Sequence, residues 1–170
     1  MSSKGRCVVF AALFGPFVAV AAGQNVMVSE SAQGVPGDEP SFDVRISADG
    51  THALLTSLAS NLTGKKDLNF LTDVFVRNLA TGATVRVSRT ATNAGGNGES
   101  FGTAISPDGR FSVYTTLATN LIPGDANHAI DVVLHDESSN TNFAVSVATD
   151  GRQADGQSQH AVPGGRRGRT

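Results

Sequence analysis

The hexapeptide Ile-Ser-Ala-Asp-Gly-Thr at residues 46–51 returns 59 residues later as Ile-Ser-Pro-Asp-Gly-Arg at residues 105–110. Both copies place Asp-Gly between apolar runs. This dipeptide favours a tight hairpin turn, because glycine accepts a positive φ and aspartate bonds its own backbone. Self-similarity at a fixed spacing of a few tens of residues is typical of repeat architectures. Each other segment of the chain can therefore be given a position in the repeat by its distance in sequence from one of these two turns.

The similarity continues well beyond the turn. Residues 56–62 read Thr-Ser-Leu-Ala-Ser-Asn-Leu and residues 115–121 read Thr-Thr-Leu-Ala-Thr-Asn-Leu, so hydroxyl residues are exchanged only for hydroxyl residues. After a one-residue deletion, an Asp-x-Asn-x-x-x-Asp-Val pattern at 67–74 recurs at 125–132. These matches indicate two copies of one unit, and Val28-Ser29 matches the end of an earlier one.

Each unit predicts four short antiparallel β-strands. In the first unit the strands are expected to end near Ile46 and to cover 52–58, 73–77 and 84–88; in the second they end near Ile105 and cover 111–117, 131–135 and 142–147. The last strand alternates apolar and polar residues, which is typical of a half-buried strand. Four antiparallel strands per repeat is the pattern of propeller blades. The predicted fold class is all-β: an incomplete β-propeller of two four-stranded blades, with flanking partial blade strands.

These residues resemble the TolB-type WD-like β-propeller repeats of exported and periplasmic bacterial proteins. The resemblance rests on the Ile-Ser-x-Asp-Gly turn, the Ala-Ser/Thr-Asn-Leu segment, the Asp-x-Asn-x-x-x-Asp-Val loop and the Thr-Gly hairpin. It covers roughly residues 28–162. The resemblance implies the fold and an exported location, and it implies little about activity, because propellers support many functions.

Residues 1–23 predict a cleaved signal peptide. Lys4 and Arg6 form a basic start, an uncharged apolar stretch follows, and Ala-Val-Ala at 19–21 provides a small-x-small cleavage pattern. The alternative is an uncleaved membrane anchor, but the stretch is at the short limit for a span and contains Pro16. We therefore expect export to the periplasm or the extracellular space, with no membrane span after the leader is removed.

Composition narrows the classes of function. The net charge of −2 over 170 residues gives no electrostatic basis for binding nucleic acid. The single cysteine, Cys7, lies in the predicted leader, so the mature chain is expected to have no disulfide. Stability must then come from burial, from a metal or from partners.

The repeat divides the rest of the chain into four parts. They are a partial blade strand and loop at 24–40, blade repeat 1 at 41–99, blade repeat 2 at 100–162 and a basic Gly/Arg tail at 163–170. The tail begins where a third turn is due, which favours a truncated or frame-shifted end of a longer propeller over a simple solvated tail. Two blades cannot close a ring of four to eight. We expect exposed strand edges that invite self-association, further propeller blades or a protein partner.

The repeated acidic loops are the candidate metal sites. Each offers oxygen ligands at its first, third and seventh positions, as part of a calcium site does. The six residues are Asp67, Asn69, Asp73, Asp125, Asn127 and Asp131. Calcium takes six to eight oxygens and each loop supplies three side chains, so the preferred interpretation is that Asp and Asn cap a turn. Calcium is the one cofactor that the sequence suggests.

No catalytic residue is predicted. Gly-Glu-Ser-Phe-Gly at 98–102 matches the hydrolase nucleophile elbow in letters, but that motif needs a helix after it, and here a β repeat follows. The four histidines, at 52, 128, 135 and 160, are scattered and are expected at the surface. The leading hypothesis is a non-catalytic exported interaction or scaffold module. The alternatives are the propeller portion of an enzyme-associated hydrolase or peptidase, and a calcium-dependent surface-binding module.

Overall fold

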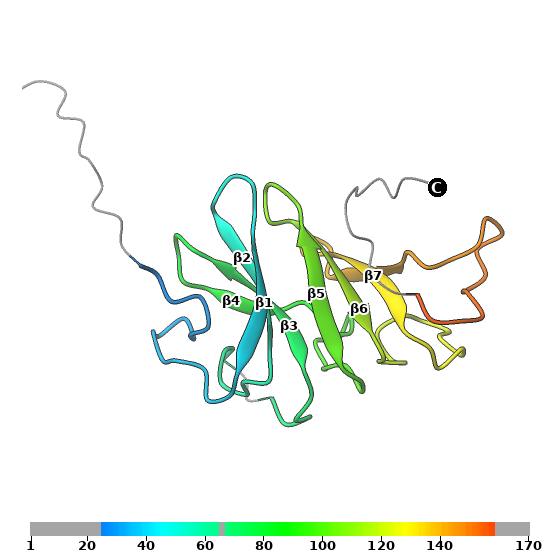
Figure 1. The fold of residues 1–170 in the computed structure, drawn as a ribbon, viewed down its shortest axis with the longest axis horizontal. Coiled ribbons are helices and arrows are strands. Elements are labelled where there is room, and N and C mark those ends of the chain that lie inside the picture. Colours follow the sequence, from blue (N-terminus) through cyan, green and yellow to red (C-terminus); the bar gives the residue numbers. More distant parts are fainter. Residues whose placement is uncertain (1–24, 65–66, 159–170) are drawn as a thin grey trace, which may run out of the picture.

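The computed structural model describes residues 25–64 and 67–158 (Figure 1). Its strands form two four-stranded antiparallel sheets, each with its strands in chain order. The first sheet contains β1 (Ser41–Ile46), β2 (His52–Ser57), β3 (Asp73–Asn78) and β4 (Thr84–Arg86), and the second contains β5 (Ser100–Ile105), β6 (Phe111–Thr116), β7 (Asp131–Asp136) and β8 (Thr141–Ala144). The prediction of an all-β chain with two four-stranded blades is confirmed. Within the described ranges no helix is long and apolar enough to cross a membrane.

The two Asp-Gly turns close the β1–β2 and β5–β6 hairpins in the same way. Ser47 Oγ donates a hydrogen bond of 2.7 Å to Asp49 Oδ1, and Ser106 Oγ donates one of 2.6 Å to Asp108 Oδ1. The serine hydroxyl is the main cause of a lowered pKa for each aspartate. The glycine after each aspartate has a φ of 71° or 74°, which explains why glycine follows it in both copies.

The two sheets stack through one apolar cluster, and β5 packs against β1, β2 and β3 of the first sheet (Figure 1). The cluster contains residues from both sheets and from the segments after β4 and β6: Leu54, Val74, Val76, Val87, Tyr114, Ala118, Leu121, Ile122 and Val133. Tyr114 is the bulkiest fully buried side chain, and burial raises the pKa of its hydroxyl. The second sheet therefore sits on the first mainly through β5.

A smaller cluster lies on the opposite face of the first sheet. It contains Leu55, Ala59, Leu62 and Phe75. The loop before β1 covers this cluster. Its Gly37 packs so closely that an added Cβ would lie 3.1 Å from the Cβ of Ala59. Adjacent strand residues point to opposite faces, so Leu54 and Leu55 enter different clusters. The middle strands of the first sheet are therefore buried on both faces.

The loop that leads into each sheet is held by the same asparagine of the repeat. Asn61 Oδ1 accepts a bond of 3.1 Å from Asp38 N, and its Nδ2 donates one of 2.9 Å to Pro36 O. Asn120 makes the equivalent two bonds, both of 3.0 Å, with the loop before β5. The Asn-Leu element of the repeat thus ties the second strand of each sheet to the preceding connection.

The segment before β1 differs from the expectation. Residues 25–29 form no strand, and the first pairing is an isolated bridge between Glu30 and Pro36. A strand needs a neighbour for its backbone groups, and the described chain has no earlier sheet to supply one. The same bridge returns between Arg89 and Gly95 and between Val147 and Gln153.

The last strand of each sheet is also shorter than expected. β4 and β8 end at Arg86 and Ala144, although Val87 N and Val145 N still donate bonds of 2.8 Å to the neighbouring strand. The predicted signal peptide and the predicted basic tail lie outside the described residues.

Candidate functional site

The loop before β3 brings the predicted ligand side chains Asp67, Asn69 and Asp73 together. Asn69 Nδ2 donates a bond of 2.9 Å to Asp73 Oδ2, and Asn69 N donates one of 3.2 Å to Asp67 Oδ1. Asn69 Oδ1 accepts a bond of 3.0 Å from Leu71 N. These short-range bonds to backbone N–H groups are those that cap a turn.

Arg86 of β4 fills the space between the two carboxylates of this loop. Its Nη1 lies 2.5 Å from Asp67 Oδ2 and 3.3 Å from Asp73 Oδ2. Ser88 Oγ donates a further bond of 2.5 Å to Asp73 Oδ1. Burial, followed by the hydrogen bond with Asp67, raises the pKa of Asp73 to about 7. Burial also acts to raise the pKa of Asp67, but its bonds with Asp73 and Arg86 outweigh that effect and lower it.

The second acidic loop repeats the turn without the arginine. Asn127 N donates to Asp125 Oδ1, and Asn127 Nδ2 donates to Asp131 Oδ1, both at 3.4 Å. The place of Arg86 in the strand pairing is taken by Ala144. Asp131 Oδ2 is buried and has no hydrogen-bond partner among the described residues. The second loop therefore has the predicted side chains together but leaves one carboxylate oxygen unsatisfied.

A second exchange accompanies the loss of the arginine. A Cβ at Gly95 would lie 2.9 Å from both terminal nitrogens of Arg86, so a residue without a side chain fits beside that guanidinium. The equivalent residue after β8 is Gln153, and its Oε1 accepts a bond of 3.3 Å from Ala126 N. Gln153 Nε2, like Asp131 Oδ2, is buried without a partner in residues 25–64 and 67–158. A glutamine thus enters the second loop from the position where the first repeat needs glycine.

Among residues 25–64 and 67–158, no three Asp, Glu, His or Cys side chains converge as a metal-binding group. Each acidic loop offers two carboxylates and one asparagine, and the asparagine oxygen already accepts a backbone N–H. Calcium at the six predicted residues stays a prediction, and the chemistry observed in both loops is that of turn caps.

Polar contacts also join each repeat to the one before it, at places we call seams. At the first seam, Arg77 of β3 is buried and its Nη2 lies 2.6 Å from Glu30 Oε1. Arg77 Nη1 donates bonds of 2.7 Å to Glu30 O and 2.8 Å to Gly82 O. This one side chain ties the segment before β1 to the first sheet.

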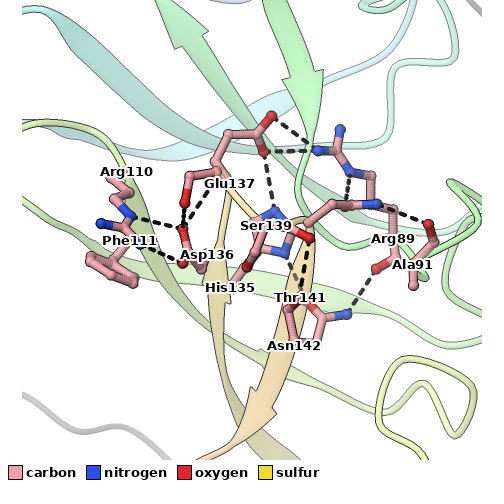
Figure 2. Close-up of polar contacts among 12 residues, drawn as sticks. Arg89, Ala91, Arg110, Phe111, His135, Asp136, Glu137, Ser139, Thr141 and Asn142 are labelled. Atoms are coloured by element: carbon pink, nitrogen blue, oxygen red, sulfur yellow. Dashed lines mark hydrogen bonds and ion pairs between the residues drawn. The ribbon is translucent and has the colours of Figure 1, made fainter.

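At the second seam the charges are reversed (Figure 2). Arg89, which lies 59 residues after Glu30, donates bonds of 3.0 and 2.9 Å to the two carboxylate oxygens of Glu137. Its Nε donates a bond of 2.7 Å to Asn140 Oδ1. The end of the first repeat is therefore held to the turn between β7 and β8.

His135 occupies the place of Arg77 at this second seam, and the prediction that it lies at the surface is wrong. Its side chain is fully buried, with Nδ1 2.8 Å from Asn142 Oδ1 and Nε2 3.1 Å from Glu137 Oε2. Figure 2 shows the Glu137 carboxylate between His135 and Arg89. Burial acts to raise the pKa of Glu137, but the bonds from His135 and Arg89 outweigh it and lower that pKa.

The face of the second sheet that points away from the first is apolar and uncovered by described residues. Its exposed members are Phe143 at 49%, Val145 at 53% and Val147 at 42% of their accessible surface. Strand pairing places the half-buried side chains of Val113, Val132 and Leu134 on the same face. We call this the open face, and it consists of Val113, Val132, Leu134, Phe143, Val145 and Val147. In the first sheet the residue equivalent to Val145 is Val87, which is fully buried.

The other residues considered in the sequence analysis are the serine of the Gly-Glu-Ser-Phe-Gly stretch and the remaining histidines. Ser100 of the Gly-Glu-Ser-Phe-Gly stretch is buried at the start of β5, and its Oγ lies 2.8 Å from Thr116 Oγ1. A strand follows this serine, whereas the nucleophile elbow needs a helix. His52 lies in β2, His128 is exposed, and His160 is outside the described residues.

The sequence analysis predicted neither the seams nor the contact between the Arg86 guanidinium and Gly95. A usable signal is present for the seams, because Glu30 and Arg89 occupy the same repeat position with opposite charge. No comparable signal links Arg86 to Gly95, since their contact depends on how the connection folds back over the sheet. Neither a scan against protein-family models nor a search of curated proteins gives a match to this chain.

Proposed function

We propose that this protein is an exported, non-catalytic β-propeller repeat module that docks a protein partner on its open face. The observation that carries the proposal is the exposure of Phe143, Val145 and Val147 on one face of the second sheet. Contiguous exposed apolar side chains on a soluble protein mark interaction sites. The basic and apolar leader in the sequence supports export.

The first sheet shows what a covered face of this repeat is like. Leu54, Val74 and Val87 are fully buried there, because the second sheet lies on them. The same positions in the second sheet form the open face. Covering a valine-sized side chain stabilises by about 1.5–3 kcal/mol relative to leaving it in water. A partner that covers the open face would therefore gain substantial free energy from the exposed residues alone.

The polar clusters of the described chain support a binding role over a catalytic one. Arg86 is bound between Asp67 and Asp73, and His135 is enclosed by Asn142 and Glu137. These groups hold loops and seams in place, and they lie away from the apolar side chains of the open face.

The substitution Val145→Asp tests the proposal, with Val44→Asp on exposed β1 as the matched control. We expect the unmodified protein to bind an anilinonaphthalene sulfonate dye and to associate as its concentration rises in sedimentation velocity. Val145→Asp should abolish both properties, because it puts a charge on the open face, while changing the unfolding free energy by less than about 0.5 kcal/mol. Val44→Asp should leave both unchanged.

Two results would contradict this function. One is an unmodified protein that stays monomeric and binds no dye at any concentration. The other is a Val44→Asp variant that loses association as completely as Val145→Asp does.

A further inference from the structure

We infer that a proton closes the second seam: His135 is held there as an imidazolium, with one N–H directed at Asn142 and the other at Glu137, and the seam loosens when that proton is lost. The inference goes beyond the proposed function, because it concerns the joint between the repeats and makes no use of the open face. It assigns a pH-sensitive contact to the position where the first seam has the permanently charged Arg77.

The side-chain amide of Asn142 determines what faces the first ring nitrogen. Asn142 Nδ2 donates bonds of 2.8 Å to Arg89 O and 3.1 Å to Leu121 O. These two carbonyls only accept, so the amide cannot turn over, and its Oδ1 is directed at His135 Nδ1, 2.8 Å away. The Tyr114 hydroxyl donates to the same Oδ1. Because an amide oxygen has no hydrogen to donate, Nδ1 of the ring carries one.

A carboxylate faces the other ring nitrogen (Figure 2). Glu137 Oε2 lies 3.1 Å from His135 Nε2, and both carboxylate oxygens accept bonds from Arg89. Burial acts to raise the pKa of Glu137, but its bond with His135 and the charge of Arg89 outweigh burial and lower it, so the group is ionised. An ionised carboxylate only accepts, and Nε2 therefore carries a hydrogen as well.

A neutral imidazole does not satisfy this site. It has a single N–H, so one of its nitrogens would present a lone pair to an oxygen that also has only lone pairs. The side chain of His135 is 0% exposed, so water does not relieve such a contact. Loss of the proton therefore sets either Asn142 or Glu137 against the ring.

The charged and titratable groups around the ring come from the elements packed against it. They are Glu137 of the turn after β7, Arg89 of the segment after β4 and Tyr114 of β6. Arginine stays charged, and burial and the charge of Asp73 raise the pKa of Tyr114, which keeps its hydroxyl neutral. Histidine is the side chain that ordinarily changes its charge near neutral pH. A change at this seam near neutral pH is therefore assigned to His135.

His52 of the first sheet has the opposite arrangement. Asn78 Oδ1 accepts bonds of 3.0 Å from Ala80 N and 2.9 Å from Thr81 N, which directs Asn78 Nδ2 at His52 Nε2, 3.1 Å away. An amide nitrogen only donates, so Nε2 has a lone pair. Thr51 Oγ1 lies 2.7 Å from Nδ1 and accepts its hydrogen. His52 therefore fits as a neutral imidazole, and the two histidines differ in their number of protons.

The second seam should weaken as the pH rises. A histidine in the unfolded chain releases its proton near pH 6.5, as the reference value of about 6.5 requires. Above that pH the folded chain still holds a proton that the unfolded chain has lost, so stability falls. The equilibrium constant for unfolding should rise by up to about tenfold per pH unit. The range above pH 7 separates this effect from that of Asp73, whose pKa is about 7.

Nitrogen NMR of the histidine side chains tests the inference in the unmodified protein at pH 7. We expect His135 to show a hydrogen on both ring nitrogens and His52 to show one on Nδ1 alone. The variants His135→Gln and His52→Gln assign the signals. A His135 ring with one bare nitrogen at pH 7 would overturn the inference.

Urea unfolding at a series of pH values above 7 gives a second test. His135→Gln can still donate to Glu137 but does not titrate, so the rise of the unfolding constant with pH should disappear. His52→Gln is the matched control and should keep the rise. Glu137→Gln guards against misfolding of the first variant: its amide can turn to donate to a neutral ring, so the rise should shrink there too. A rise that stays unchanged in a folded His135→Gln or Glu137→Gln variant would contradict the inference.

Discussion

The first and second sheets share one backbone plan and differ in how many of their faces are covered. Leu54 and Leu55 of β2 are both fully buried, each in a different cluster. In β6 the equivalent pair is Val113 and Tyr114, of which Tyr114 is fully buried and Val113 is only half-buried. The repeat therefore specifies which residues face outward from each sheet, and the neighbouring repeat decides whether those residues are buried.

The two acidic loops show a second kind of difference between the sheets. The first loop is neutralised by Arg86 and leaves room for it with Gly95. The second has Ala144 and Gln153 at those positions and leaves Asp131 Oδ2 without a partner in the part of the chain that the structure describes. The residue pairs Arg86 with Gly95 and Ala144 with Gln153 are therefore alternatives, because a side chain at position 95 would clash with the Arg86 guanidinium.

The largest expected contrast lies between two equivalent glycines, Gly98 in the connection before β5 and Gly156 in the segment after β8. A Cβ at Gly98 would lie 2.5 Å from Leu117 C and 2.7 Å from Ala118 N, both of them backbone atoms. Gly98→Ala should therefore lower the unfolding free energy by about 3 kcal/mol. The equivalent Gly156 has no described residue near its Cβ position, so Gly156→Ala should cost less than about 0.5 kcal/mol. Urea unfolding measures both, and equal losses would show that the second connection is as tightly packed as the first.

The acidic loop of the first sheet should give stability a pH dependence. The pKa of Asp73 is about 7 in the folded chain, against 3.8 without the fold. Between about pH 4 and pH 7 the folded state thus holds a proton that the unfolded state has released. Stability should fall as the pH rises through this window, by at most about 1.4 kcal/mol per pH unit.

The substitution Asp73→Asn should flatten this slope, because an amide does not titrate. Asp131→Asn, the same change in the second sheet, is the matched control and should leave the slope in place. Thermal unfolding at a series of pH values measures each variant. A slope that persists in Asp73→Asn would assign the titration to another group.

The smallest effect is expected from moving the arginine of the first sheet into the second. Ala144→Arg combined with Gln153→Gly should raise the unfolding free energy by about 1 kcal/mol, because a guanidinium then satisfies the buried oxygen of Asp131. Ala144→Arg alone should gain less, since Gln153 lies in the place that the guanidinium needs. Urea unfolding compares the two, and an equal gain from both would show that the paired change is not required.

Much of the fold could be predicted because its turns are determined by the residue types at the turn positions. The two Asp-Gly turns follow from residue type, and the structure has both, with a positive φ at Gly50 and at Gly109. The repeat also predicted that Asp67, Asn69 and Asp73 stand close together in the loop before β3. The partial blade strand expected within 24–40 is not formed by residues 25–29, because the pattern of side chains says nothing about whether a partner strand exists.

The features that could not be predicted depend on contacts between distant segments. Arg86 reaches Asp67 across the sheet, over 19 residues of sequence. The buried His135 bonds Glu137, whose carboxylate is in turn held by Arg89 of the preceding repeat. Alternation of polar and apolar residues identifies the face on which such a side chain lies, but it does not identify what covers that face.

The reversed charges at the two seams have a consequence for how this chain can change by recombination. Arg77 receives the segment before it through Glu30, whereas the end of the first repeat presents Arg89. A tandem duplication of the first repeat would set Arg89 of one copy against Arg77 of the next, with two guanidinium groups in one enclosed space. The two repeats are therefore not interchangeable, and a further copy of the first repeat would need a change at Arg77 or Arg89 before it could pack.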